Sequence, residues 1–309
     1  MVMTLSPQKK IKKLYLDAMK KIILIITIIT LNFSCNYNKK KSADDSKQVI
    51  TVSILPQRTF VQKIAGNDFA VNVLIPPGAS PAAYTLLPSQ LKDINRSEIW
   101  FRIGHIGFEQ SWKEKIQQVN KNMKVIDLSE GLDLITTDNI KNKDDKHAKG
   151  FDPHIWMSPT LVKQMCLKIT STLSQLNPDK ESVYNANYKK FVKNIEILDQ
   201  KIKNALREYK GQQIITYHPS LSYYARDYGL VQHSLEPGGK EPTPQHMAEV
   251  IKLAKQENIN IIYIQSDFDR EHAGVFAEEV DGKIIEIWPL DPEWSENLLE
   301  ITNILINHF

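Results

Sequence analysis

The segment from Glu181 to Tyr209 most narrows what this chain can fold into, because it contains neither glycine nor proline. Its apolar positions are spaced four and three residues apart in strict alternation, and they are Tyr184, Tyr188, Phe191, Ile195, Leu198, Ile202, Ala205 and Tyr209. Such spacing puts one apolar stripe on a single helix that is about 40 Å long. Pro178-Asp179 is a typical helix start, and Gly211 marks the end.

Short β-rich runs alternate with helical patterns on both sides of this segment. The predicted strands cover residues 49–55, 70–75, 98–101, 124–127, 213–216, 230–235, 259–264 and 283–287. The predicted helices cover residues 59–66, 88–96, 107–119, 158–176, 219–228, 242–257, 268–279 and 293–307. The alternation predicts an α/β fold in which two lobes have mainly parallel sheets.

The long helix separates two groups of four strands, so we expect it to join the lobes as one rigid connection. The predicted N-terminal lobe covers residues 49–178, the connecting helix 179–210, and the C-terminal lobe 211–309. A coiled-coil arm of about four heptads is the alternative interpretation of the same stripe.

The N-terminus carries the features of an export signal. Lys20 and Lys21 precede the apolar run Ile22–Leu31, which is shorter than the roughly 20 apolar residues that span a bilayer. The run is followed by Cys35, so we predict a lipoprotein signal peptide over residues 1–34 and acylation of Cys35. A buried helix is the alternative for the apolar run.

Two details bear on how this signal is processed. Asn32 stands where lipoprotein signals usually have a small or aliphatic residue. Met19 begins a more typical signal than Met1 does, so residues 1–18 are either part of the signal or not translated. Residues 35–48 are polar and are predicted to tether the lipid to the first lobe. We therefore predict that the protein is extracytoplasmic, in the periplasm, and that a lipid anchors it to a membrane.

The excess of basic over acidic side chains in the whole chain comes from this signal. Of the 39 basic and 36 acidic side chains, six lysines and Asp17 lie in residues 1–34, which leaves 33 and 35, a formal charge of −2. A weakly acidic mature chain offers no electrostatic case for nucleic-acid binding.

Two of the eight histidines have contexts that indicate metal binding. His154 lies in the sequence Asp-Pro-His-Ile-Trp just before a predicted helix, and His218 directly follows the predicted strand 213–216. Residues at the carboxyl ends of parallel strands face the crevice where α/β proteins bind ligands. One histidine from each lobe predicts an ion site in the cleft between the lobes, whereas each ring by itself also fits a structural role.

The same residues carry a family resemblance. The chain resembles the zinc- and manganese-binding solute-binding lipoproteins of bacterial ABC importers, and the resemblance covers roughly residues 49–309. The matching motifs are Asp152-Pro153-His154-Ile155-Trp156, Pro77-Gly78-Ala79-Ser80-Pro81 with Tyr84 and Pro88-Ser89, Gly107-Phe108-Glu109, the stretch from His218 through Tyr228-Gly229-Leu230, and Gly239-Lys240-Glu241-Pro242.

This resemblance implies two lobes joined by a long rigid helix and a binding protein without catalysis. It implies a monomer that passes a divalent ion to the ABC permease of the inner membrane. A histidine at position 218 resembles the zinc-selective branch, so we expect Zn²⁺, with Mn²⁺ or Fe²⁺ as the alternatives.

The chain departs from the family pattern at two ligand positions. Ala82 stands where the family usually has its first histidine, and Trp288 stands where a carboxylate often completes the site. Zinc in proteins usually has four ligands, so either another side chain substitutes or the protein has changed in its affinity or its metal. The leading substitute is His105, which follows a first-lobe strand between Gly104 and Gly107.

Two carboxylates of the second lobe, Glu241 and Asp267, are further candidate metal ligands, although helix capping is the competing role for both. Three other function classes stay open. A metallohydrolase would need a general base, but His-Glu-x-x-His, Gly-x-Ser-x-Gly and Gly-rich phosphate motifs are all absent. A binding protein for a siderophore or corrin chelate, or an adhesin with weak metal binding, would share the fold.

Overall fold

The computed structural model describes residues 47–82, 84–137, 150–265 and 270–309. The predicted signal peptide, Cys35 and Asp267 lie outside these residues. Among the described helices, none combines the length and the apolarity that a membrane span needs.

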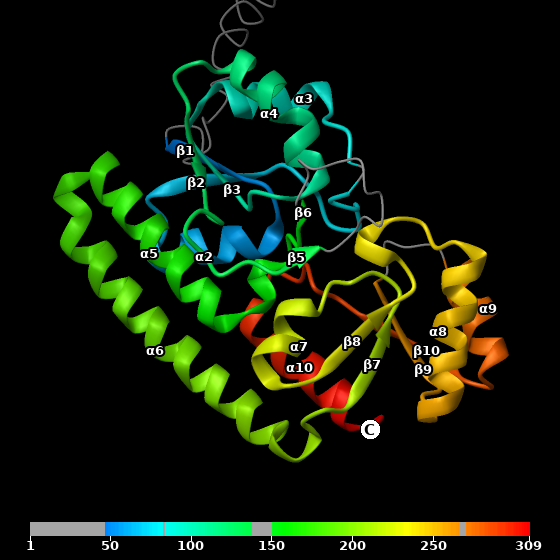
Figure 1. The fold of residues 1–309 in the computed structure, drawn as a ribbon. Helices are drawn as coiled ribbons and strands as arrows, with labels where there is room; N and C mark the ends of the chain where they lie inside the picture. Colours follow the sequence, from blue (N-terminus) through cyan, green and yellow to red (C-terminus); the bar gives the residue numbers. More distant parts are fainter. Residues whose placement is uncertain (1–46, 83, 138–149, 266–269) are drawn as a thin grey trace, which may run out of the picture. The chain divides into compact units, whose positions relative to one another are not determined.

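The N-terminal lobe is built on a parallel sheet with the strand order β2-β1-β3-β4 (Figure 1). Its strands are β1 (Gln48–Val52), β2 (Phe69–Val73), β3 (Ser97–Arg102) and β4 (Lys124–Asp127). Helices α2 and α5 cover one face of this sheet, and α3 and α4 cover the other (Figure 1). These helices are α2 (Leu55–Ala65), α3 (Pro88–Asn95), α4 (Gly107–Val119) and α5 (Pro159–Leu176). All four strands predicted before the long helix are therefore present.

The C-terminal lobe repeats the plan with the strand order β10-β9-β7-β8, again fully parallel. Its strands are β7 (Gln213–Thr216), β8 (Val231–Ser234), β9 (Ile261–Gln265) and β10 (Lys283–Ile287). Its helices are α7 (Ser222–Tyr228), α8 (Pro244–Glu257), α9 (Glu271–Glu279) and α10 (Trp294–Ile306).

Strand β9 is buried on both faces, which explains its continuous apolar run. Ile262 and Ile264 of β9 pack into one hydrophobic cluster with α8 and α9, whereas Ile261 and Tyr263 join the cluster on the opposite face. This alternation is the two-residue period of an extended strand.

Shorter elements connect these units. A two-stranded antiparallel ribbon pairs β5 (Thr136–Thr137) with β6 (Gly150–Phe151). The 3-10 turns are η2 (Ile155–Met157), η3 (Pro178–Lys180), η4 (Arg207–Tyr209) and η5 (Pro237–Gly239).

The long helix is α6 (Glu181–Ala205), with 25 residues or about 37 Å of length. Its buried side chains fall on the predicted stripe, and they are Tyr184, Phe191, Ile195, Leu198 and Ile202. The helix packs against α2 and α5 of the first lobe and against α10 of the second (Figure 1). It is therefore a packed connection between two α/β lobes and not an isolated coiled-coil arm. The exact lobe boundaries at 178/179 and 210/211 stay predictions.

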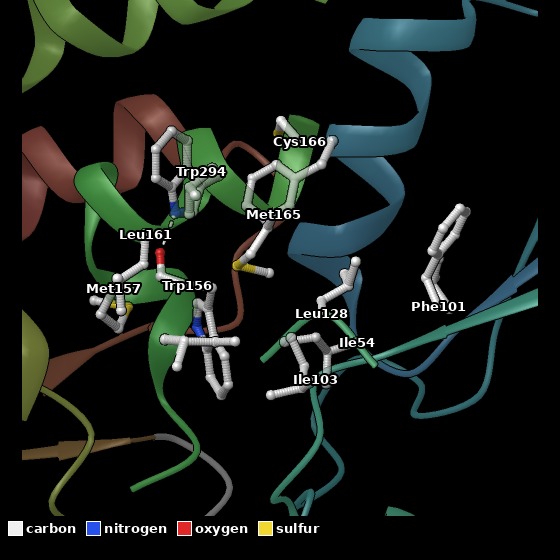
Figure 2. Packing of buried hydrophobic residues seen from close by; sticks show 14 of the residues in the cluster. Ile54, Phe101, Ile103, Leu128, Trp156, Met157, Leu161, Met165, Cys166 and Trp294 are labelled. Atoms are coloured by element: carbon white, nitrogen blue, oxygen red, sulfur yellow. Dashed lines mark hydrogen bonds between the residues drawn. The ribbon is translucent and has the colours of Figure 1, made fainter. Parts of the chain in front are cut away.

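The two lobes share one hydrophobic core along this helix. Trp294, the first residue of α10, meets Phe60 of α2 edge to face at 5.3 Å between ring centroids and lies 6.5 Å from Phe191 of α6. Its indole Nε1 donates to the carbonyl of Trp156 at 2.7 Å, as Figure 2 shows. In return, Nε1 of Trp156 donates to the carbonyl of Pro289 at 2.8 Å. These two bonds connect Trp156 of the first lobe to residues near the end of the second lobe.

The start of α2 corrects the sequence prediction, which continued the first strand to residue 55 and began the helix at 59. The strand ends at Val52 and the helix begins at Leu55. The side-chain oxygen of Gln57 accepts from the backbone N–H of Ser53 at 2.9 Å and of Ile54 at 3.1 Å. This capping by a buried glutamine, with Pro56 in the first turn, starts the helix inside an apolar run.

Candidate metal centre

His154 is held rigidly at the end of the first lobe. It immediately precedes η2, and its side chain is buried. Nδ1 of His154 lies 2.8 Å from Oδ1 of Asp152, which also accepts from the backbone N–H of His154 at 2.9 Å. Tyr223 of α7 donates to the Asp152 carbonyl at 2.8 Å. The second lobe thus helps to position the loop that carries His154.

The charge on Asp152 is set by this contact. Burial works to raise the pKa of the Asp152 carboxyl, but the interaction with His154 and the hydrogen bonds to it lower the pKa overall. The ionised carboxylate accepts a hydrogen bond from Nδ1–H of His154, so the arrangement favours Nε2 as the coordinating nitrogen.

His218 has a matching arrangement in the second lobe. It follows β7 by two residues, and its Nδ1 lies 2.6 Å from Oε2 of Glu236, a buried carboxylate. Burial lowers the pKa of His218, and the hydrogen bond with Glu236 opposes that effect. A lowered pKa keeps the imidazole neutral, which is the form that binds metal ions.

The two rings come together across the cleft. Their centroids are 5.1 Å apart, and the ring planes make an angle of 76°. A zinc ion at ~2.0–2.1 Å from one nitrogen of each ring, with a tetrahedral angle at the metal, puts two imidazole centroids about 5 Å apart. The observed pair therefore already has the spacing of two ligands on one ion.

Gly239 of η5 lies directly against the imidazole of His218. Its φ is +75°, and a Cβ added to it would lie 3.0 Å from Cε1 of His218. A residue without a side chain is needed here because the backbone passes so close to the imidazole.

Both histidines line a cavity of about 380 Å³ between the lobes. Its wall also includes the first-lobe segment Ser80–Ala82, His105 and Phe151, and on the second-lobe side Lys240 and Gln265. His105 is thus placed in the predicted cavity, with its ring centroid 5.0 Å from that of Phe151. Burial lowers the pKa of His105, and Asp127 opposes that effect.

The loop that carries His105 has a fixed backbone. The N–H groups of Ile103 and Gly104 each donate to the buried Glu109 carboxylate at 2.7 Å. Gly104 has a φ of +116°, and a Cβ there would lie 2.2 Å from Oγ of Ser129. This turn therefore requires a glycine at position 104.

The structure does not bring Glu241 to this cavity. Glu241 is exposed beyond η5 and is not among the lining residues. Trp288 is 40% exposed and lines a second interlobe cavity of about 160 Å³. Within the described residues, no three His, Cys, Asp or Glu side chains are grouped closely enough to hold a metal ion.

Glu236, which bonds to His218, is a site residue that was not predicted from the sequence. Glu236 is separated from it by 18 residues, and only the pairing of β7 with β8 brings the two segments together. The sequence does carry a weaker signal, since Glu236 follows the end of a strand next to a Pro-Gly-Gly turn.

Comparison with known proteins identifies the family of the chain. The family model described as the periplasmic component A of the zinc-uptake complex, ZnuA, matches residues 50–303. A crystal structure of ZnuA is 35% identical and superposes with a TM-score of 0.78, covering 85% of this chain and 99% of that one.

Two sequence relatives extend over most of the chain. A protein of Chlamydia trachomatis is 26% identical over 286 residues, which are 92% of this chain and 99% of the relative. The high-affinity zinc uptake system protein ZnuA of Bacillus subtilis is 24% identical over 284 residues and covers 85% of each chain. With a family model that matches most of its length and a ZnuA structure that shares its fold, this chain belongs to the ZnuA family of periplasmic zinc-uptake components.

Proposed function

We propose that this protein captures zinc between its two lobes and delivers it to an ABC importer. The observation that carries the proposal is the pair of imidazoles of His154, which is buried, and His218, whose side chain is 11% exposed. Their centroids are 5.1 Å apart, and a carboxylate lies against Nδ1 of each ring. Nitrogen ligands oriented by carboxylates are a typical zinc arrangement. The family is a transport family that binds metal, so the protein is not an enzyme.

Calorimetric titration of the purified mature protein tests this function. We expect zinc to bind with at least about 100-fold higher affinity than magnesium, because neutral imidazole prefers zinc and magnesium prefers oxygen ligands. Manganese and ferrous iron belong in the same series, since they are the alternative cargoes. Zinc binding no stronger than magnesium binding would contradict the proposal.

We also propose His105 as a third ligand in place of the family histidine that Ala82 replaces. The two segments lie side by side: the N–H of Phe108 donates to the Pro81 carbonyl at 3.1 Å, and a Cβ on Gly107 would lie 2.8 Å from the Ala82 carbonyl oxygen. His105 therefore reaches the cavity from beside the Ala82 position. Because the backbone is fixed by Glu109, the imidazole would approach the metal by side-chain rotation.

Replacing Glu236 by glutamine is expected to lower zinc affinity about 10- to 100-fold, which is the usual effect of losing a residue that orients a metal ligand. Glutamine keeps the size of the side chain but not the charge that holds the Nδ1 proton of His218. Glu249→Gln, on the exposed surface of α8, is the matched control and should bind zinc like the wild type. Equal zinc affinity in the two variants would show that Glu236 does not orient the ligand.

The family places the protein outside the cytoplasm, and we propose that an acylated Cys35 anchors it to the membrane as a monomer. Cys35→Ala is expected to abolish lipidation and to move the protein from the detergent phase to the aqueous phase in a partition assay. The buried Cys166, mutated to alanine, serves as the control and should leave partitioning unchanged. Unchanged partitioning of Cys35→Ala would exclude this residue as the anchor.

A further inference from the structure

Gln265, the last residue of β9, has an unusual environment. It is 6% exposed, and its side-chain Nε2 has no hydrogen-bond partner among the described residues. It lines both the cavity that holds His154 and His218 and the neighbouring apolar cavity. Buried polar side chains in native proteins nearly always have partners, so this donor calls for an acceptor inside the cleft.

An N–H donor does not bind a cation. It needs an oxygen with a lone pair, such as that of a carboxylate. Lys240, whose side chain is exposed, is the one Lys or Arg among the described lining residues of the cavity. Asp152 is the one acidic side chain among the described lining residues, and it already bonds to His154. Beside the imidazole pair, the cavity therefore offers a donor and a positive charge.

The coordination count points the same way. Zinc takes four ligands, and the imidazoles of His154 and His218 supply two, or three if His105 joins them. Among the side chains that the structure describes, this leaves at least one position without a ligand. A cavity of about 380 Å³ also falls in the range of sites for small molecules and exceeds what a single ion needs.

From these observations we propose that the protein carries its metal together with a small carboxylate-bearing co-ligand. One carboxylate oxygen coordinates the metal held by His154 and His218, the other accepts from Nε2 of Gln265, and Lys240 balances the charge. This inference rests on the proposed function and specifies the form in which the cargo is bound.

Native mass spectrometry with zinc and either L-histidine or histamine tests the inference, because histamine has the same imidazole and amine but lacks the carboxylate. We expect a protein–zinc–histidine complex and no complex with histamine. If zinc binds alone and L-histidine only removes it, the inference is wrong while the proposed function stands. If zinc does not bind under any condition, the proposed function itself is wrong.

The role of Gln265 is tested by two variants that remove the donor: Gln265→Leu adds no charge, and Gln265→Glu adds a negative charge. The zinc form of each variant is expected to bind L-histidine at least about tenfold more weakly than the zinc form of the wild type does. This factor is the effect of one hydrogen bond to a charged group. Gln245→Leu on α8 is the control and should behave as the wild type. A thermal unfolding measurement on each variant checks that it is folded. Folded Gln265 variants that retain L-histidine like the control would overturn the assignment.

Discussion

His154→Ala and His218→Ala are each expected to lower zinc affinity by more than about 100-fold, because loss of an orienting partner alone already costs up to that factor. Either change removes one of the two imidazoles that already have the spacing of two ligands on one ion. Calorimetric titration measures the effect. His308→Ala, near the C-terminus and exposed, is the control and should bind zinc normally. Wild-type affinity in either cleft variant would place the metal elsewhere.

The same titration decides the position of His105. If His105 is a third ligand, His105→Ala should weaken zinc binding as severely as either of the other two substitutions. If His105→Ala binds zinc like the wild type while the other two variants do not, the protein supplies two imidazoles and the remaining ligands come from outside the chain.

Trp294→Ala is expected to lower the free energy of unfolding by about 4 kcal/mol, the usual cost of truncating a fully buried tryptophan. Trp294 is 1% exposed and packs against Phe60 and Phe191. The change also leaves the buried carbonyl of Trp156 without its donor, which typically costs about 1–3 kcal/mol within such a total. Denaturant unfolding followed by circular dichroism measures the loss.

The matched control for this substitution is Trp288→Ala. Trp288 is 40% exposed, so its truncation should cost under about 1 kcal/mol. A loss in Trp294→Ala as small as in this control would mean that the first lobe and α10 do not share a cooperative core.

The same shared core limits motion between the lobes. Because α6 packs along α2 and α5 at one end and α10 at the other, a large rotation of one lobe would expose apolar side chains of the common cluster. The helix connects the lobes, and the buried tryptophans add a second connection that the sequence analysis did not anticipate.

Much of the fold was predictable because it depends on local periodicity. The stripe from Tyr184 to Ile202 repeats at helical spacing, and that repeat alone predicted α6. The eight strands were found because apolar, β-branched runs fall between helical patterns at regular intervals. The start of α2 was predicted wrongly, because Leu55 continues the apolar run and the capping by Gln57 depends on side-chain geometry.

The candidate site, like the fold, was predictable from the sequence only in part. The sequence by itself determined His154 and His218 as candidates, since each follows or precedes an element at the edge where parallel sheets bind ligands. Only the tertiary structure decided what surrounds them. Glu236 reaches His218 through strand pairing, and Gln265 enters the cleft from β9. Glu241 stays outside although it is close to Glu236 in sequence. These contacts join residues far apart along the chain, and their geometry depends on how sheets and lobes pack, which no local pattern encodes.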